Sequence, residues 1–373
     1  MNSTKIHIVS FAIPYPPDYG GIIDVFYKIK SLWKNDVEII LHCFEYERKR
    51  SDELLKFCKK VYYYPRNKSL IDFFSFKPFI VKSRTSRALL NNLLKDTHPV
   101  LLEGIHSSFY LSKLLKNKRK IILRTHNIEH KYYRALAKKE TSFLRWIYYY
   151  VESIKLKYYE KKQVVKNIFI ATISPSDYLY FQSINPNTIY LPAFHSNEQV
   201  ITKRGKGNFI LFHGNLSVNE NITAAGYILK NICPKVNYSF IFAGKNPSQR
   251  LINKVKKHKN AQLIINPSEE KMKELICDAH IHLLITFQNT GIKLKLINAL
   301  FGGRFCLTNH TMINNTHLES LVYSAETPDE FVTLITQLMT QTFSDNLLNK
   351  REQLLLKKVN NNLNVQKLIP LLN

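Results

Sequence analysis

The sequence has few cysteines and no long hydrophobic run. Its five cysteines are odd in number, widely spaced and mostly set in apolar runs, so they predict neither a disulfide framework nor a zinc site. A reducing cytoplasm fits this pattern best. No apolar run reaches the roughly 20 residues that cross a bilayer. Residues 1–10 have one lysine before a short apolar run, which is typical of a first core strand and not of a signal peptide. We expect a soluble or peripheral protein.

Acidic residues are scarce relative to basic ones. The chain has 28 Asp+Glu against 54 Lys+Arg, which gives a formal net charge of +26. Such an imbalance attracts polyanions, which include nucleic acid, an anionic membrane surface and phosphorylated substrates. The basic excess is greatest over residues 113–166. A solvated lysine-rich face explains the same charge, so charge alone does not choose among these partners.

The chain has the length and apolar content for two α/β domains. It has 373 residues, of which 45% are hydrophobic. Short apolar runs alternate with helical patterns in two series, a βαβ arrangement that predicts two Rossmann-like domains facing across a cleft. The predicted strands are 6–13, 37–44, 61–64, 100–103, 121–124 and 168–174, then 209–213, 238–243, 261–265 and 280–285.

The polar segment 202–208 is the predicted linker. We expect residues 1–201 to form the first domain and residues 202–357 the second. The stretch 330–373 has a helical pattern, and its last helix, about 358–373, is expected to pack back on the first domain.

One long helix is predicted over residues 143–165. Apolar side chains recur there at three- and four-residue steps, and Arg145, Glu152 and Lys155 lie off this stripe. We expect the stripe to pack into the interior, although a membrane face is the alternative. The stripe comprises Phe143, Trp146, Ile147, Tyr150, Val151, Ile154 and Tyr158.

Two polar turns of the first half lie where parallel sheets bind ligands. The first strand leads to adjacent Gly20 and Gly21, which open a helix whose first N–H groups can meet an anion, although glycines in such turns are often structural. The fifth strand ends in residues 124–130, where His126 can donate to a phosphate or a sugar hydroxyl and Glu129 can hold an acceptor. Helix N-capping is the alternative role for these groups. Asn127 joins Glu129 as an acceptor-binding candidate.

The second half has comparable turns. Its first two strands exit at residues 213–221 and 244–247, which contain Asn215 and Lys245. Lys245 is a candidate for neutralising a diphosphate, and plain surface exposure is the alternative.

A small-residue turn at residues 290–298 follows an apolar run and feeds an amphipathic helix. The helix is predicted to begin near Gly291, which leaves the N–H groups of Ile292, Lys293 and Leu294 for a diphosphate. Lys293 and Lys295 lie on a face that needs an anionic partner. The turn thus predicts a nucleotide-linked substrate, with a purely structural helix start as the alternative.

The ordered set of motifs resembles the bacterial retaining glycosyltransferases of the GT-B fold, of the type called glycosyl transferases group 1 (family 4-like). The resemblance covers most of the chain. It is carried, in family order, by residues 17–21, 124–130, 173–177, 190–195, 214–216, 242–244 and 290–293.

The resemblance implies a transferase that moves a sugar, with retention, from a nucleotide-sugar held by the second domain to an acceptor held by the first. The acceptor would be a glycan or a lipid-linked molecule of a bacterial surface polysaccharide or glycoconjugate. His126 matches the histidine expected at the donor sugar or reacting centre. No metal and no cofactor are expected, because helix N-termini at Gly20–Gly21 and 291–293 would stabilise the departing diphosphate. No enzymic nucleophile is assigned.

The chain departs from the family at several donor contacts. The usual pair of glutamates, eight positions apart, falls on Thr290 and Asn298, and the usual phosphate-binding arginine falls on Asn215. Thr290 and Asn298 can still hydrogen-bond hydroxyls, while Lys293, Lys245 or Lys295 would restore the missing positive charge.

Other functions remain open at this stage. A GT-B relative without transferase activity, either an epimerase or a degenerate binding subunit, fits the missing glutamates. A nucleic-acid-binding protein would use the charge directly, but the sequence has no helix-turn-helix cue, zinc-finger spacing or aromatic RNA-binding signature, so we expect no nucleic-acid partner. For the transferase, the basic segment 113–166 would lie near an anionic membrane surface, on the cytoplasmic face.

Overall fold

The structure is a computed structural model that describes residues 4–67, 69–164, 166–287, 293–314 and 316–372. Contacts between Cα atoms divide the described chain into two compact units. The first unit holds residues 4–196 and 359–372, and the second holds residues 197–287 and 293–358.

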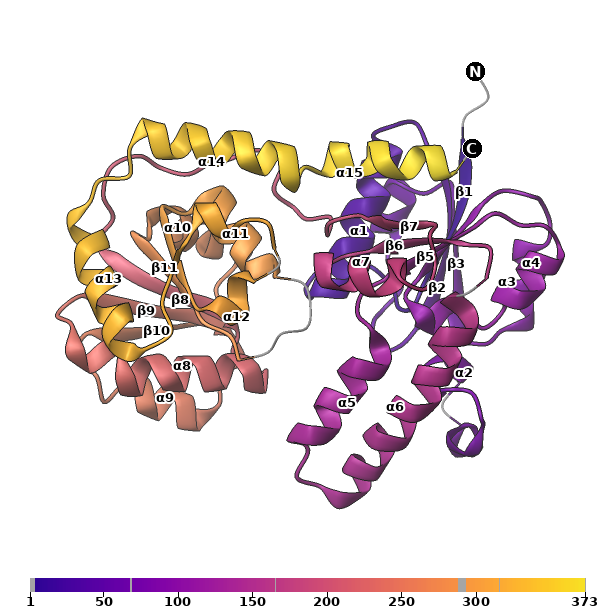
Figure 1. The fold of residues 1–373 in the computed structure, drawn as a ribbon, viewed down its shortest axis with the longest axis horizontal. Helices are drawn as coiled ribbons and strands as arrows, with labels where there is room; N and C mark the ends of the chain where they lie inside the picture. The colour runs from indigo at the N-terminus through magenta and orange to yellow at the C-terminus, as the bar shows by residue number, and fades with distance from the viewer. Residues whose placement is uncertain (1–3, 68, 165, 288–292, 315, 373) are drawn as a thin grey trace. The chain divides into compact units, whose positions relative to one another are not determined.

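A parallel sheet forms the centre of the first unit (Figure 1). Among the described residues it has seven strands in the order β3-β2-β1-β4-β5-β6-β7. Buried β-branched and leucine side chains fill both faces of β1, β4 and β5, as in a sheet covered by helices on each side. The strands are β1 (Lys5–Ser10), β2 (Glu38–Glu45), β3 (Lys60–Pro65), β4 (Val100–Glu103), β5 (Ile121–Thr125), β6 (Phe169–Thr172) and β7 (Thr188–Tyr190).

Helices connect these strands in the crossover manner that parallel pairing requires. The α-helices of the first unit are α1 (Gly20–Trp33), α2 (Phe79–Lys82), α3 (Arg87–Leu93), α4 (Leu111–Lys116), α5 (Glu129–Lys139), α6 (Phe143–Val164), α7 (Pro175–Gln182) and α15 (Asn361–Leu368). The shorter 3-10 turns are η1 (Asp52–Lys56), η2 (Leu70–Phe74), η3 (Ile105–Ser107) and η6 (Ile369–Leu371).

The second unit repeats the architecture with six described strands in the order β10-β9-β8-β11-β12-β13. The strands are β8 (Phe209–Asn215), β9 (Ser239–Lys245), β10 (Ala261–Ile265), β11 (Ile281–Leu284), β12 (Phe305–Thr308) and β13 (Tyr323–Ser324). The helices are α8 (Asn219–Asn231), α9 (Gln249–Val255), α10 (Glu269–Asp278), α11 (Leu294–Gly302), α12 (His310–Ile313), α13 (Pro328–Thr340) and α14 (Asp345–Lys358), with 3-10 turns η4 (Cys233–Lys235) and η5 (Glu319–Leu321).

The predicted fold class is confirmed, because both sheets are parallel and alternate with helices. Every strand predicted from an apolar run is present, with shifts of a few residues at the ends. Three strands were not predicted: β7 and β13 are very short, and β12 is a four-residue strand that begins three residues after the end of the apolar helix α11. Among the described helices, none combines the length and apolar character needed to cross a bilayer.

The end of the chain completes the first unit. The Asn361 side chain accepts a hydrogen bond from His195 N (3.2 Å) and donates one to His195 O (2.7 Å). Asn364 donates to Pro192 O at 3.3 Å. Val365 and Leu368 are fully buried in the same apolar core as strand β1. Helix α15 therefore packs against α1 as part of this core.

Helices α5 and α6 form an antiparallel hairpin that extends away from the sheet of the first unit (Figure 1). The long helix predicted over residues 143–165 is present as Phe143–Val164, and residue 165 lies outside the described residues. The orientation expected for it was wrong. Phe143, Trp146 and Tyr158 are exposed, whereas Glu152, on the opposite side of the helix, is buried.

Polar contacts account for this orientation of α6. Glu152 accepts a hydrogen bond from Phe79 N at 2.6 Å, and Glu160 accepts from Glu129 N at 2.9 Å. Both donors are N–H groups in the first turn of another helix, where a carboxylate is favoured by the unpaired N–H groups and by the helix dipole. The inward face of α6 is therefore fixed by two glutamates, and the apolar stripe faces outward.

Asp24 on α1 joins three parts of the first unit. Its carboxylate accepts hydrogen bonds from Arg124 Nη2 (2.8 Å) on β5 and from Phe194 N (2.8 Å) after β7. Asp24, Lys28 and Arg124 are fully buried. Burial alone would raise the pKa of Asp24, but Arg124 and Lys28 hold it well below its usual value.

Replacing Asp24→Asn should therefore destabilise the protein strongly. The change leaves Arg124 and Lys28 buried with one negative charge fewer, so we expect a loss of about 3–5 kcal/mol in the free energy of unfolding. Asp329→Asn, at an exposed ion pair with Lys235, is the matched control and should change it by less than about 1 kcal/mol. Urea unfolding of both variants checks this, and equal losses would show that the buried network contributes no special stability.

Candidate active site

A cluster of charged side chains is buried at the carboxyl ends of β4 and β5. Glu103 and Arg124 are paired neighbours at the ends of these strands, and His126 follows β5. Lys28 on α1 donates to Glu103 Oε1 at 2.6 Å and to Asp24 Oδ2 at 3.0 Å. The cluster therefore lies at the edge where parallel sheets bind their ligands.

His126 is held by the two carboxylates of this cluster. Its Nε2 lies 3.2 Å from Glu103 Oε2 and 3.5 Å from Asp24 Oδ2. Burial opposes protonation of the ring, but the hydrogen bonds to Asp24 and Glu103 outweigh it and raise the pKa of His126 above the usual 6.5. The imidazolium is thus stabilised, and its Nδ1 is the nitrogen directed away from Glu103.

The start of α1 lies against the His126 ring. As predicted, the Gly20–Gly21 pair opens this helix, which has no acidic residue in its first turn and no side-chain N-cap. A Cβ atom added to Gly21 would lie 3.1 Å from the Phe11 ring and 3.4 Å from His126 Nδ1. Glycine therefore lets the helix N-terminus approach the histidine closely.

The ligand atoms of Asp24, Glu103 and His126 lie within 4.8 Å of one another, which is close enough to hold a metal ion. Lys28 already bonds both carboxylates, and Arg124 bonds Asp24. A divalent cation would lie beside these two fixed positive charges, which disfavours it. The geometry supports an ion-pair network around the histidine.

Glu129 is a second buried carboxyl near the end of β5. It is the first residue of α5, and Asn127 Nδ2 lies 3.5 Å from its Oε1. Burial, followed by the charge of Glu160, raises the pKa of Glu129 to about 8. Glu160 from α6, and not His126 or Glu129, satisfies the first N–H groups of α5.

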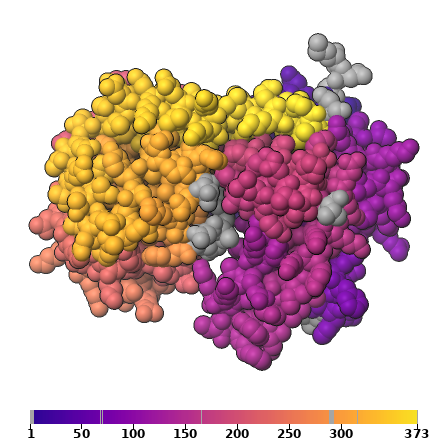
Figure 2. All heavy atoms as spheres, in the orientation of Figure 1, coloured from indigo at the N-terminus to yellow at the C-terminus, as the bar shows by residue number. Residues whose placement is uncertain are grey.

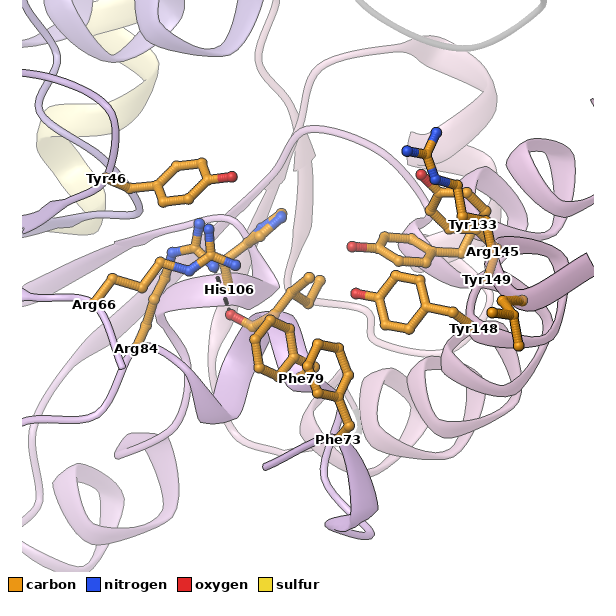
Figure 3. Close-up of a pocket in the computed structure, with 12 residues that line it drawn as sticks. Tyr46, Arg66, Phe73, Phe79, Arg84, His106, Tyr133, Arg145, Tyr148 and Tyr149 are labelled. Carbon is orange, nitrogen blue, oxygen red and sulfur yellow. Dashed lines mark hydrogen bonds between the residues drawn. The ribbon is translucent and has the colours of Figure 1, made fainter. Parts of the chain in front are cut away.

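A cavity of about 670 Å³ lies in the first unit beside this cluster. Tyr133, Tyr148 and Tyr149 line one side of it, opposite Arg66 and Arg84 (Figure 3). These tyrosines belong to α5 and α6. His106 also lines the cavity. Its ring is tilted against Phe11 with the ring centroids 5.5 Å apart, and Phe11 in turn makes an edge contact with His126 at a centroid distance of 5.4 Å.

The two arginines make the cavity positive. Arg84 is buried and donates to the carbonyl oxygens of Phe11 (2.8 Å) and Ile80 (2.7 Å), and neither Arg84 nor Arg66 forms an ion pair with a carboxylate of the described chain. Burial and the nearby Arg66 charge lower the pKa of Arg84 to about 9. Burial, with Arg84 and His126 close by, also holds the pKa of His106 well below its usual value, so its ring is neutral. An anionic group would be favoured here.

In the second unit, Asn215 and Lys245 are paired neighbours at the carboxyl ends of β8 and β9. Both side chains are exposed. The Asn215 side chain accepts hydrogen bonds from Ser217 N (3.0 Å) and Ser217 Oγ (2.7 Å), and therefore forms a turn. The structure thus places these two sequence-predicted residues together at the ligand-binding edge of the sheet.

Helix α11 begins at Leu294 with Lys293 as its N-cap residue, slightly later than predicted. Thr290, Gly291 and Ile292 lie outside the described residues. Asn298, on α11, accepts a hydrogen bond from Asn197 Nδ2 at 2.8 Å.

Glu220 is the acidic group near the two lysines. Burial lowers the pKa of Lys293, and of Lys295 to about 8, while the Glu220 charge opposes both shifts. Lys295 donates to Asn221 Oδ1 at 3.2 Å. Glu220 therefore supplies at least part of the anionic partner expected for this face.

Several residues of this site were not predicted from the sequence. Asp24 and Lys28 are spaced i, i+4 inside the apolar helix α1, a charged pair on a buried face that the pattern did contain. Glu103 was predicted only as the last residue of an apolar strand, without a role in the site. Arg66, Arg84 and His106 come from separate loops and helices, and no local spacing connects them.

Replacing Glu129→Gln should stabilise the protein increasingly as the pH rises. The folded pKa of about 8 exceeds the usual 4.5, so the wild type loses stability between these values, and the variant, which has no proton to lose, does not. The difference should be near zero below about pH 4.5 and reach about 2–4 kcal/mol by about pH 9. Chemical unfolding across this range measures it, with the exposed Glu352→Gln as control. A constant difference would contradict a protonated Glu129.

No protein-family model matches the chain. A Klebsiella pneumoniae protein, described as an uncharacterised 44.6 kDa protein in the cps region, is 29% identical over 347 residues, which span 85% of this chain and 87% of that protein.

Solved glycosyltransferase structures match the chain over almost its whole length. TarM superposes with a TM-score of 0.68 at 12% identity, covering 100% of this chain and 99% of that one. A variant of S. aureus TarM, in complex with fondaparinux, α-GlcNAc-glycerol and UDP, gives 0.65 at 11% identity, covering 99% and 100%. A Rickettsia africae glycosyltransferase gives 0.64 at 12% identity, covering 99% and 98%.

Identities this low show the fold alone. The two parallel-stranded units and the agreement over both of them establish that this chain has the fold of the GT-B glycosyltransferases.

Proposed function

We propose that the protein is a retaining glycosyltransferase that moves a sugar from a nucleotide-sugar to a glycan or lipid-linked acceptor. The observation that carries the proposal is His126 in a GT-B fold, because its ring lies on a buried carboxylate pair that raises its pKa. The similarity to a protein of a cps region supports a role in bacterial surface polysaccharide or glycoconjugate synthesis.

The donor is proposed to bind the basic turns of the second unit. Lys293 and Lys295 are buried cations at the start of α11, and Lys245 adds a further cation beside Asn215. These groups suit a diphosphate. Asn298 is proposed to bind a donor hydroxyl, and Thr290, Gly291 and Ile292 remain proposed donor contacts.

His126 is the proposed catalytic residue. With Nε2–H donating to Glu103, the imidazolium has Nδ1–H to donate to the reacting sugar, and its positive charge stabilises negative charge that develops on the leaving group. The adjacent N-terminus of α1 at Gly20 and Gly21 supports the same role, because unpaired N–H groups and the helix dipole favour an anion.

A metal ion is not required by this proposal. Lys28 and Arg124 occupy the carboxylates that a metal would use, and lysines with helix N-termini offer positive charge for the diphosphate. No cofactor is proposed, since the nucleotide-sugar is a substrate.

The acceptor is proposed to bind the aromatic cavity of the first unit. Tyrosine rings suit the apolar faces of sugars, and Arg66 with Arg84 suits an anionic group of the acceptor. Asn127 and Glu129 are proposed acceptor contacts, and Tyr133, one turn after Glu129 on α5, lines the cavity. We propose a cytoplasmic location with the acceptor at the inner face of the membrane.

The second candidate is a GT-B relative without transferase activity, either an epimerase or a binding subunit. It is favoured by Thr290 and Asn298 at positions where the family has glutamates. Transfer to an acceptor separates the two, because an epimerase would convert the nucleotide-sugar without an acceptor and a binding subunit would not convert it.

A panel of nucleotides and nucleotide-sugars tests the proposal. One of them should raise the melting temperature of the full chain, since a ligand of the folded state stabilises it. With a matching acceptor, NMR of the product should show the anomeric configuration of the donor. His126→Asn should lower kcat by at least about 100-fold and keep donor binding. Binding without turnover by the wild type would favour the second candidate, and no stabilisation by any of the panel would contradict both.

Lys293→Ala should weaken donor binding at least about tenfold, because it removes a charge from the diphosphate contacts. Calorimetry with the nucleotide-sugar found above measures this. The exposed Lys257→Ala, in the same unit, is the matched control. An unchanged dissociation constant for Lys293→Ala would remove this residue from the donor site.

A further inference from the structure

The outward stripe of α6 is an apolar surface without a partner in the described structure. Six of its side chains, at three- and four-residue steps, have exposed fractions between 37% and 73%. Single exposed apolar residues are common on proteins, but a contiguous apolar strip usually marks an interaction site. The six are Phe143, Trp146, Ile147, Val151, Ile154 and Tyr158.

A second apolar group lies beside this stripe. Phe74, the last residue of η2, and Phe76 are 89% and 100% exposed. Their neighbour Phe73 is fixed inward, because its ring stacks at 4.0 Å on Phe79 and its carbonyl oxygen accepts a hydrogen bond from Lys155 of α6 at 2.7 Å. The loop is therefore anchored to α6 while it presents two phenylalanines to solvent.

Lysines border both apolar groups. Lys77, next to Phe76, lies 4.0 Å from the Phe109 ring and is close enough to Lys82, Lys113 and Lys162 to be affected by their charges. Lys166 continues the set beyond α6 and donates to Ser112 Oγ at 2.6 Å. In the described part of the chain, none of these five lysines forms an ion pair with a carboxylate. The positive charge of this border is thus uncompensated.

The hairpin that carries these groups is prominent. Figure 2 shows α5 and α6 as a lobe that extends from their own unit. Exposed aromatic and aliphatic side chains with a lysine border suit a surface that is apolar inside and anionic at its boundary.

We propose that the outward face of α6, with Phe74, Phe76 and the five lysines, docks on an anionic lipid bilayer. The apolar side chains enter the boundary between head groups and acyl chains, and the lysines contact the anionic head groups. This gives the membrane-side location proposed above a defined surface, and it does not depend on transferase activity.

Charge favours a bilayer over the other occupants. In a symmetric pair of two copies the same patch faces itself, so the lysine borders would repel each other. Nucleic acid would engage the lysines, but its affinity comes mainly from phosphate contacts and would not require aliphatic residues such as Ile147, Val151 and Ile154.

Vesicle binding by the full chain tests the proposal without any sugar substrate, so its failure is distinguishable from failure of the proposed enzymatic function. In co-sedimentation, the protein should bind phosphatidylcholine vesicles that contain phosphatidylglycerol, and bind pure phosphatidylcholine at least about tenfold more weakly. High salt should weaken the anionic binding. Indifference to lipid charge, or no binding to either vesicle, would overturn the proposal.

Two sets of variants identify the surface. Phe74→Ser with Phe76→Ser, and separately Lys113→Gln with Lys162→Gln, should each weaken binding at least about tenfold. The matched controls are Leu179→Ser, an exposed apolar residue on α7, and Lys256→Gln with Lys257→Gln in the second unit; both should bind as the wild type does. These positions are exposed or lie at the surface, so circular dichroism and thermal unfolding should be unchanged. Equal losses in test and control variants would overturn the assignment.

Tryptophan fluorescence reports directly whether α6 contacts the bilayer. The chain has two tryptophans, and Trp33→Phe leaves Trp146 on the stripe as the only one. Its emission should shift to shorter wavelength on anionic vesicles and be quenched by brominated lipids. If the shift instead follows protein concentration without lipid, together with a doubled mass in sedimentation velocity, the face joins two copies and the proposal is wrong.

Discussion

The first unit depends on a small set of charges that are buried together. Asp24 and Glu103 are neutralised by Lys28 and Arg124, and each of these groups belongs to a different element or to a different turn of α1. Buried ions are tolerated only when they are paired and hydrogen-bonded. The pairing therefore fixes how α1 meets β4, β5 and the segment after β7. The same two carboxylates also fix the position of His126, because its ring contacts both of them.

The fold was predictable because a parallel strand that is buried on both faces has a continuous apolar run in the sequence. Apolar runs such as 100–103 and 209–213 located strands without reference to distant residues. The orientation of α6 was not predictable in the same way. Its stripe has the period of a buried face, but Glu152 and Glu160 serve the N-termini of other helices, and these partners lie 73 and 31 residues away. The periodicity of a single helix does not reveal such contacts.

The residues of the candidate site fall into the same two groups, those that local sequence predicts and those that it does not. Residues at strand ends, such as His126, Asn215 and Lys245, could be named because a parallel sheet collects its carboxyl ends on one edge. Arg66, Arg84 and His106 could not, because they converge only after folding. Glu220 lies between these cases: the two lysines indicated that an anion was needed, and the structure supplies one from α8.

The closing segment of the chain has a consequence for how the protein is made. Val365 and Leu368 fill the same core as the first strand, and Asn361 and Asn364 hold the segment from Pro192 to His195. A ribosome makes this helix about 160 residues after the rest of its unit, because the second unit lies between them in the sequence. During synthesis the earlier part must wait with an open core while the second unit emerges and folds. A fragment that stops at residue 358 would keep that core open permanently, so the two units are not separable by a single cut.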